Sequence, residues 1–210
     1  TLSLLADRWY GHPSGKMTVI GVTGTKGKST TCYFIAKILE EAGFKVGMTS
    51  TAMFKIAERE WLNPYKMTMR GRFALHGLLD QMVRAGCRYA VVETSSEGIA
   101  QYRHAGIVYD VTAFTNIAPE HIEAHGSFEK YLEAKTKLFS GLKKRAGGLP
   151  FKNQKAIIVN GDDAQAERFS SFPADVYYRY GTSAFRSLPV GAVFRDVRAE
   201  NILSGADGSV

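Results

Sequence analysis

A glycine- and lysine-rich run follows an apolar, β-branched stretch, Met17 to Val22, near the start of the chain. A loop of this composition between a buried strand and a helix is typical of phosphate-binding loops, because glycines let backbone N–H groups turn toward phosphate oxygens. In such a loop Lys28 reaches the β- and γ-phosphates and the Ser29 hydroxyl binds Mg²⁺. The strict pattern needs glycine at position 22, so this loop is a variant with its glycine at position 24. The expected nucleotide-binding residues are Gly24, Thr25, Lys26, Gly27, Lys28, Ser29 and Thr30.

A second candidate position is Glu93, at the end of the apolar stretch Tyr89 to Thr94. A carboxylate at the end of a buried strand is costly unless it meets a cation, and magnesium held between phosphates is such a cation. Polar side chains follow it in the chain, namely Ser95, Ser96, Gln101 and Arg103. They offer hydroxyl, amide and guanidinium donors to an anionic substrate, although serines after a strand also commonly cap the next helix.

These residues need a scaffold of alternating elements. The hydrophobic periodicity predicts strands at 17–22, 45–50, 89–94, 111–115 and 156–159, and helices at 29–41, 75–86 and 127–142. Such alternation predicts an α/β fold, a P-loop-type and mostly parallel sheet flanked by helices, with ligands at the carboxyl ends of the strands. Only weak strand signals follow, at 176–180 and 192–197. The sequence therefore predicts a domain truncated at its C-terminal end, with residues 1–16 leading into an incomplete ATP-binding unit at 17–210.

Composition narrows the class of protein. The 210 residues are 45% hydrophobic and carry a net charge of +7, which would draw in anions such as nucleotides, anionic sugar precursors or nucleic acid. No basic stripe interleaved with aromatic residues is present to stack bases, so we expect no nucleic-acid partner. No apolar run approaches the length of about 18 residues needed for a membrane span, and no secretory signal begins the chain. We expect a cytoplasmic protein with two reduced core cysteines, Cys32 and Cys87.

Several motifs then arrive in a recognisable order. The loop is followed by Glu93-Thr94-Ser95-Ser96, by Gln101 and Arg103, by Asn116 with Glu120-His121, and by Tyr131-Leu132-Glu133-Ala134-Lys135. This series resembles the Mur ligase family over about Trp9 to Phe169. Within the family it is most similar to the ligases that add the third residue of the peptidoglycan stem peptide.

The resemblance implies a site that holds ATP and Mg²⁺. It implies catalytic roles for Lys28, Glu93, His121 and Lys135, with Ser29, Glu93, His121 and Lys135 as the magnesium ligands. Lys135 acts there as a carbamate formed with CO₂, whereas a lysine on an apolar helix would ordinarily be solvated. It also implies that Asn116 contacts ATP. Five residues are implied to contact the other substrate: Thr68, Ser95, Ser96, Gln101 and Arg103.

The implied partners are a UDP-linked muramoyl peptide and an amino acid. In the reaction that the resemblance implies, a substrate carboxylate attacks the γ-phosphate of ATP, and the amine of the amino acid then displaces phosphate from the resulting acyl phosphate. Four positions depart from the family pattern: Lys26 replaces an asparagine, Glu97 replaces a histidine, and Met69-Arg70 replace a threonine-proline pair. Two alternatives remain open, namely a related ligase similar to folylpolyglutamate or cyanophycin synthetases, and a P-loop ATPase or nucleotide-binding fragment that is not a ligase. We expect the chain alone to bind nucleotide but to ligate poorly.

Overall fold

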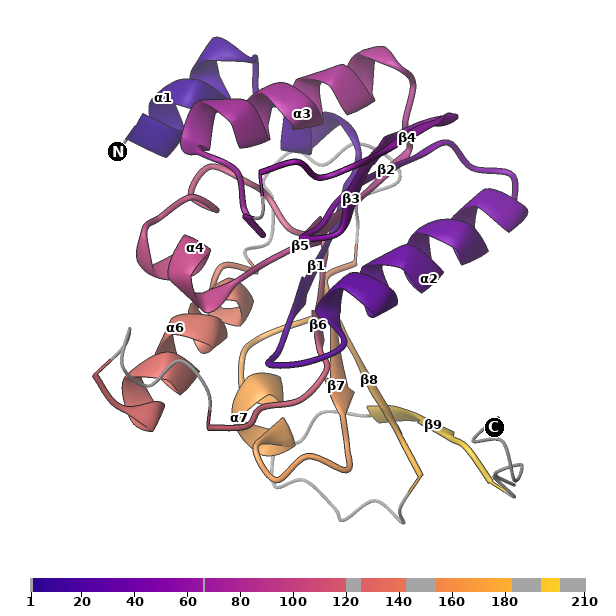
Figure 1. Ribbon diagram of the computed structural model, residues 1–210. Helices are drawn as coiled ribbons and strands as arrows, with labels where there is room; N and C mark the ends of the chain where they lie inside the picture. Colours follow the sequence, from indigo (N-terminus) through magenta and orange to yellow (C-terminus); the bar gives the residue numbers. More distant parts are fainter. Residues whose placement is uncertain (1, 66, 120–125, 143–153, 183–193, 201–210) are drawn as a thin grey trace.

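The computed structural model describes residues 2–65, 67–119, 126–142, 154–182 and 194–200. One nine-stranded sheet runs through the molecule in the order β4-β3-β2-β5-β1-β6-β7-β8-β9 (Figure 1). The strands are β1 (Thr18–Thr23), β2 (Val46–Thr49), β3 (Met53–Ile56), β4 (Arg59–Leu62), β5 (Tyr89–Glu93), β6 (Val111–Phe114), β7 (Ala156–Asn160), β8 (Val176–Gly181) and β9 (Phe194–Arg198). Within these ranges no helix is long and apolar enough to cross a membrane.

The sheet is parallel except at one edge. Every neighbouring pair from β2 to β9 is parallel, whereas β3 pairs antiparallel with both β2 and β4. The carboxyl ends of the parallel strands therefore meet along one side of the sheet, which is where α/β folds carry their ligand-binding loops. The predicted α/β class with a mostly parallel sheet is confirmed.

Helices cover both faces of the sheet (Figure 1). The helical segments are α1 (Leu2–Trp9), η1 (Pro13–Lys16), α2 (Lys28–Glu41), α3 (Arg72–Arg84), α4 (Ser96–Ala100), α6 (Phe128–Ser140) and α7 (Ala166–Ser170). Helix α2 lies on one face, and α3, α4, α6 and α7 lie on the other.

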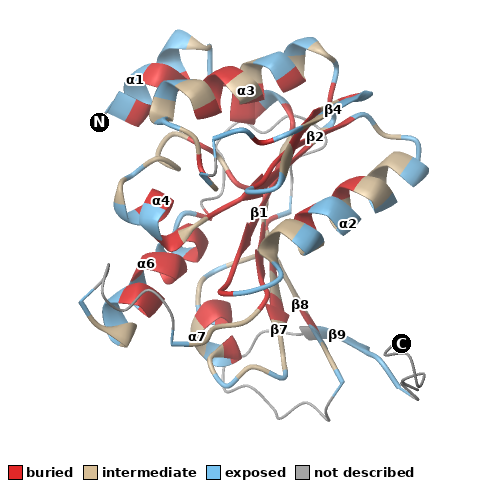
Figure 2. Cartoon of the chain, in the orientation of Figure 1, coloured by how far each residue is buried: buried red, intermediate tan, exposed pale blue. Residues whose placement is uncertain are grey.

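Alternation along the strands builds two apolar cores. On β1, Ile20 packs in the core under α2 and Val19 packs in the core under α3 and α6. On β5, Val91 faces α2 while Ala90 and Val92 face the opposite side. This is the period of two that an extended strand imposes, and the central strands are buried on both faces (Figure 2). The central strand β1 is thereby fixed from both sides.

The segment that was expected to lead into the domain is folded onto it. Helix α1 and the 3₁₀ turn η1 both pack against α3, and Ser3, Ala6 and Asp7 are buried there. The Asp7 carboxylate accepts from His12 Nδ1 at 2.7 Å, and the Ser3 hydroxyl donates to the Tyr102 carbonyl at 2.6 Å. Residues 2–16 thus contact the chain well beyond β1.

Sequence patterns missed the β3–β4 hairpin. Its two strands have four residues each, and they turn at Ala57, which adopts a positive φ of 50°. Glycine and asparagine are the usual residues at such a position, so the turn carries none of the ordinary sequence signals. The weak signals near residues 176 and 192 do correspond to strands, β8 and β9.

Candidate functional site

The phosphate-binding loop joins the central strand β1 to α2. Gly24 has a φ of 151°, and a Cβ on it would lie 2.0 Å from Thr115 Oγ1 and 2.9 Å from the Asn116 carbonyl oxygen. Only glycine fits this close approach of two backbones. Gly27 precedes the first turn of α2 with a φ of 78°. The loop therefore ends at a helix N-terminus, whose free N–H groups and partial positive charge favour phosphate.

Helix α6 holds the loop from the other face of the sheet. Lys135 Nζ donates to the Gly24 carbonyl at 2.7 Å and lies 4.5 Å from the centre of the Tyr131 ring. The hydroxyl oxygens of Tyr131 and Thr25 lie 3.0 Å apart. Lys135 is only 2% exposed, so it is not the solvated side chain that a lysine on an amphipathic helix usually is. It instead supplies a buried hydrogen bond to the loop.

The segment after β6 holds the loop a second time. Asn116 accepts from the Lys26 amide through Oδ1 at 2.9 Å and donates to the Lys26 carbonyl through Nδ2 at 3.0 Å. Its own carbonyl accepts from the Thr25 amide at 2.8 Å, and Thr115 Oγ1 donates to the Lys26 carbonyl at 2.8 Å. Asn116 was predicted to contact the nucleotide. In the structure its side chain binds the backbone of the phosphate-binding loop.

The Glu93 carboxylate reaches the loop from the end of β5. It accepts three hydrogen bonds: from Ser29 Oγ at 2.7 Å, from the Thr51 amide at 2.7 Å and from Thr51 Oγ1 at 3.0 Å. Glu93 is 2% exposed, and these three donors satisfy its buried carboxylate oxygens. Because the Ser29 hydroxyl donates a hydrogen bond to Glu93, its oxygen lone pairs remain available to a metal ion.

The loop lysine and a nearby cysteine complete this region. Lys28 Nζ donates to the Thr25 carbonyl at 2.8 Å, which folds the side chain back along the loop. On α2, burial raises the pKa of the Cys32 thiol well above its ordinary value, and the Glu93 carboxylate acts in the same direction. The thiol therefore stays protonated and behaves as part of the apolar core. Cys87 is also buried and free.

The residues predicted to contact the second substrate fall into two groups. Thr68 Oγ1 lies 2.8 Å from Thr51 Oγ1 and so joins the hydrogen-bonded chain that leads to Glu93. Gln101 and Arg103 bind each other, with Arg103 Nε donating to Gln101 Oε1 at 2.9 Å, and Arg103 Nη1 donates to the Met69 carbonyl at 2.5 Å. Because Met69 is next to Thr68 in the chain, the second group lies close to the first.

The two serines behave differently from each other. Ser95 Oγ accepts from the Gly98 amide at 3.1 Å and caps α4, which is the alternative that the sequence left open for it. Ser96 is 6% exposed within the first turn of α4. Both still follow Glu93 directly at the carboxyl end of β5.

The structure thus brings together Lys28, Ser29, Glu93 and Lys135 around the phosphate-binding loop, while His121 lies outside the described residues. Among the residues that are described, no group of three or more His, Cys, Asp or Glu side chains gathers as a metal site. The Ser29 hydroxyl and the Glu93 carboxylate nevertheless fit a hard cation, since Mg²⁺ takes oxygen ligands and keeps much of its coordination for water and phosphate.

Sequence reasoning missed residues that hold the site in place. Thr51 follows β2, Asn160 is the last residue of β7, and Asp163 follows that strand. All three are polar residues at the carboxyl ends of parallel strands, which is the signal that could have identified them. Asp163 accepts from the Ile117 amide at 2.8 Å, and Asn160 donates to the Thr115 carbonyl at 2.8 Å.

The phosphate-binding loop lies at the carboxyl end of the central strand of a mostly parallel sheet and leads into a helix N-terminus. This arrangement defines a domain of the phosphate-loop α/β class. The comparison with protein families is specific within that class. The chain belongs to the Mur ligase family, and its residues 22–209 match the model of the Mur ligase middle domain. The resemblance noted in the sequence is thereby confirmed.

Two relatives illustrate the similarity. The chain is 37% identical over 210 residues to a UDP-N-acetylmuramyl-tripeptide synthetase of Roseiflexus sp. (strain RS-1), which covers 99% of this chain and 40% of the relative. It is also 37% identical over 169 residues to a UDP-N-acetylmuramoyl-L-alanyl-D-glutamate--2,6-diaminopimelate ligase of Parabacteroides distasonis, covering 80% of this chain and 34% of that protein. The chain therefore spans well under half of the length of these relatives.

Solved structures give the same fold. A UDP-N-acetylmuramoyl-L-alanyl-D-glutamate--2,6-diaminopimelate ligase matches with a TM-score of 0.66 and 27% identity, covering 80% of this chain and 32% of that chain. E. coli FolC in complex with DHPP and ADP matches with a TM-score of 0.57 and 22% identity, covering 87% and 48%. At that lower identity the likeness shows the fold alone.

Proposed function

We propose that this chain is the ATP-binding unit, at residues 17–210, of a cytoplasmic ligase that adds an amino acid to UDP-N-acetylmuramoyl-L-alanyl-D-glutamate. The observation that carries the proposal is the Glu93–Ser29 hydrogen bond of 2.7 Å, which joins the end of β5 to the phosphate-binding loop. It pairs an anionic and a neutral oxygen ligand beside a helix N-terminus, as a magnesium-bound triphosphate requires. The names of the relatives support the substrate.

In the proposed reaction the chain acts by positioning and by charge. The loop amides and Lys28 hold the β- and γ-phosphates while the substrate carboxylate attacks the γ-phosphorus and ADP leaves. Ser29 and Glu93 would hold Mg²⁺, which when bound would neutralise further phosphate charge. The amine of the amino acid then attacks the acyl phosphate, so that an amide forms and phosphate leaves. No side-chain nucleophile is required.

Two further ligand assignments belong to this proposal. His121 and a carbamate on Lys135 would complete the magnesium site, an assignment that rests on the resemblance to the family. The position of Lys135 supports its importance to the loop, because its Nζ already lies 2.7 Å from the Gly24 carbonyl. A mass increase of one CO₂ on Lys135, seen in the intact protein at neutral pH and lost in acid, would test the carbamate.

The second substrate is assigned to the side of the site that carries Thr68, Gln101 and Arg103. Thr68 connects to Glu93 through Thr51, and the Arg103 guanidinium offers the planar donor pair that suits a carboxylate or phosphate. A folylpolyglutamate-type ligase would share the loop and Glu93 but would lack the set of Ser95, Ser96, Gln101 and Arg103. That set favours the cell-wall precursor.

The decisive experiment compares the chain with the longest form of the protein that contains it. Each is incubated with ATP, Mg²⁺, the UDP-linked muramoyl dipeptide and one amino acid at a time, and phosphate release is followed together with product mass. We expect the chain to bind nucleotide and ligate poorly, and the longer form to give a product larger by one amino acid residue. Phosphate release with a folate acceptor, or with no acceptor at all, would instead support a folate ligase or a simple ATPase.

A further inference from the structure

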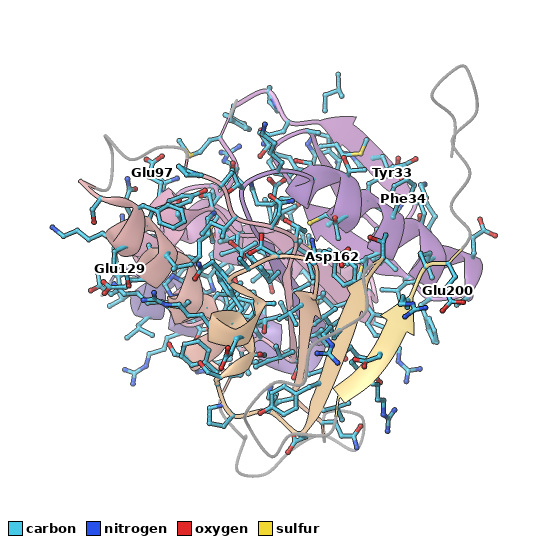
Figure 3. All side chains as sticks on the ribbon, turned by 90° about the horizontal axis from the view of Figure 1, so that it is seen from below. Tyr33, Phe34, Glu97, Glu129, Asp162 and Glu200 are labelled. Atoms are coloured by element: carbon cyan, nitrogen blue, oxygen red, sulfur yellow. The ribbon has the colours of Figure 1, made fainter. Side chains whose placement is uncertain are left out.

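Two adjacent acidic residues in the turn after β7 have different partners. Asp163 accepts from the Ile117 amide through Oδ2 at 2.8 Å and from the Gln165 amide through Oδ1 at 2.8 Å. Asp162 accepts from the amide and the hydroxyl of Thr182, at 2.7 and 3.0 Å, after the end of β8. Figure 3 shows the molecule from below, with Asp162 labelled near the centre of the view. Neighbours in the sequence thus hold two different segments.

Asn160 holds the same segment as Asp163. Its Nδ2 donates to the Thr115 carbonyl at 2.8 Å, and its Oδ1 accepts from the Asp162 amide at 3.0 Å. The turn therefore fixes the segment Thr115–Ala118 at two backbone positions, the carbonyl of Thr115 and the amide of Ile117. None of these contacts is to the phosphate-binding loop itself.

The same segment also binds the phosphate-binding loop. The Asn116 carbonyl accepts from the Thr25 amide at 2.8 Å, its Oδ1 accepts from the Lys26 amide at 2.9 Å, and the Ala118 amide donates to Thr25 Oγ1 at 3.0 Å. The Thr115 carbonyl and the Ile117 amide thus bind residues that end or follow β7, while the Thr115 hydroxyl, Asn116 and the Ala118 amide bind the loop. A displacement of the segment must therefore change the loop.

We propose that Asp163 and Asn160 are positioning residues that preset the phosphate-binding loop through the segment Thr115–Ala118. A loop held in its binding conformation loses little entropy when an anion arrives, so affinity depends on how firmly it is held. Asp163 provides the strongest contact because its acceptor is charged. The inference rests on the proposed function only in taking a nucleotide as the ligand.

The adjacent aspartates supply a matched pair of variants, Asp163→Asn and Asp162→Asn. Isothermal titration of the chain with ADP and Mg²⁺ should show affinity about tenfold weaker for Asp163→Asn, which corresponds to about 1.4 kcal/mol. Asp162→Asn should stay within about twofold of the unchanged chain. The unfolding midpoint of each variant, measured under the same conditions, distinguishes the loss of one contact from the loss of the fold. Asn160→Ala serves as the second variant if Asp163→Asn unfolds.

Amide hydrogen exchange without nucleotide gives a readout that a merely stabilising residue would not move. Asp163→Asn should speed exchange at Ile117 and also at Thr25 and Lys26, whereas Asp162→Asn should speed it at Thr182 and leave Thr25 and Lys26 protected. Unchanged protection of Thr25 and unchanged ADP affinity in Asp163→Asn would overturn the inference while leaving the proposed function intact. If the unchanged chain binds no nucleotide, the proposed function fails, and the exchange pattern alone decides this inference.

Discussion

Replacing Glu93 by glutamine separates its charge from its shape. In the structure Oε2 accepts from both Ser29 Oγ and the Thr51 amide, while Oε1 accepts from Thr51 Oγ1. A glutamine whose amide oxygen takes the place of Oε2 still accepts the hydrogen bonds from Ser29 and from the Thr51 amide. Its NH₂ group can donate to the Thr51 hydroxyl. We therefore expect the free energy of unfolding to change by only about 1 kcal/mol, because weaker hydrogen bonds are offset by the smaller cost of burying a neutral group.

Magnesium-dependent binding should respond far more strongly. Two unit charges 4 Å apart attract by about 4 kcal/mol at an effective dielectric constant of about 20, and each 1.4 kcal/mol corresponds to about a tenfold change in affinity. Glu93→Gln should therefore reduce the enhancement of ADP binding by Mg²⁺ at least about a hundredfold. Isothermal titration with Mg²⁺ and with a chelator measures this enhancement.

The control for this experiment is Glu97→Gln, which removes an exposed carboxylate that binds Gln101 on α4. Figure 3 shows Glu97 toward one side of the view, on the opposite side from Tyr33 and Phe34 of α2. This variant should keep the enhancement. If Glu93→Gln binds ADP with the same dependence on Mg²⁺ as the unchanged chain, Glu93 is not a magnesium ligand and the assignment of the site is wrong.

Three further outcomes follow from the structure. Lys28→Met should weaken ADP binding at least about tenfold, because it removes a cation from the phosphates. Lys130→Met, on the exposed face of α6, should leave the affinity unchanged. Equal affinities of the two variants would exclude Lys28 as a phosphate contact. Gly24→Ala should abolish ADP binding in the same titration, because its Cβ would lie 2.0 Å from Thr115 Oγ1, and retained binding would show that the loop can rearrange. Burial lowers the pKa of His76 in the folded chain. The free energy of unfolding should therefore be highest at a pH above about 6.5, the pKa of histidine in the unfolded chain, and should decline as the pH falls below that value. Urea unfolding midpoints at several pH values should show this decline, and His76→Gln should flatten it.

Local patterns predicted the parts of the fold that depend on neighbouring residues. The strand, loop and helix around Gly24 to Ser29 follow from apolar periodicity and glycine placement, and the structure has all three. Glu93 could also be placed, since the end of a buried strand in a parallel sheet is a definite location. Its hydrogen bonds to Thr51 could not be predicted, because Thr51 follows β2, and no local pattern gives the position of β2 in the sheet.

Burial of Lys135 shows the limit of periodicity. The pattern of α6 places this residue on a helix with an apolar face, but a lysine there is ordinarily solvated. Its partner is the Gly24 carbonyl, 111 residues away, and only the pairing of distant strands brings the two together. The same is true of Asp163, whose contact with Ile117 joins segments 46 residues apart. The role of Ser95 as a helix cap was one of two alternatives that the sequence could not separate.

The central position of β1 also has a consequence for how the protein folds. Its neighbours in the sheet are β5 and β6, and contacts such as Ser29–Glu93 and Lys26–Asn116 span 64 and 90 residues. Pairings of such long range close large chain loops and form slowly, so we expect this site to assemble late in folding. The fluorescence of an ADP analogue should accordingly change only when the native state forms during refolding. A collapsed intermediate rich in helix should not bind the analogue.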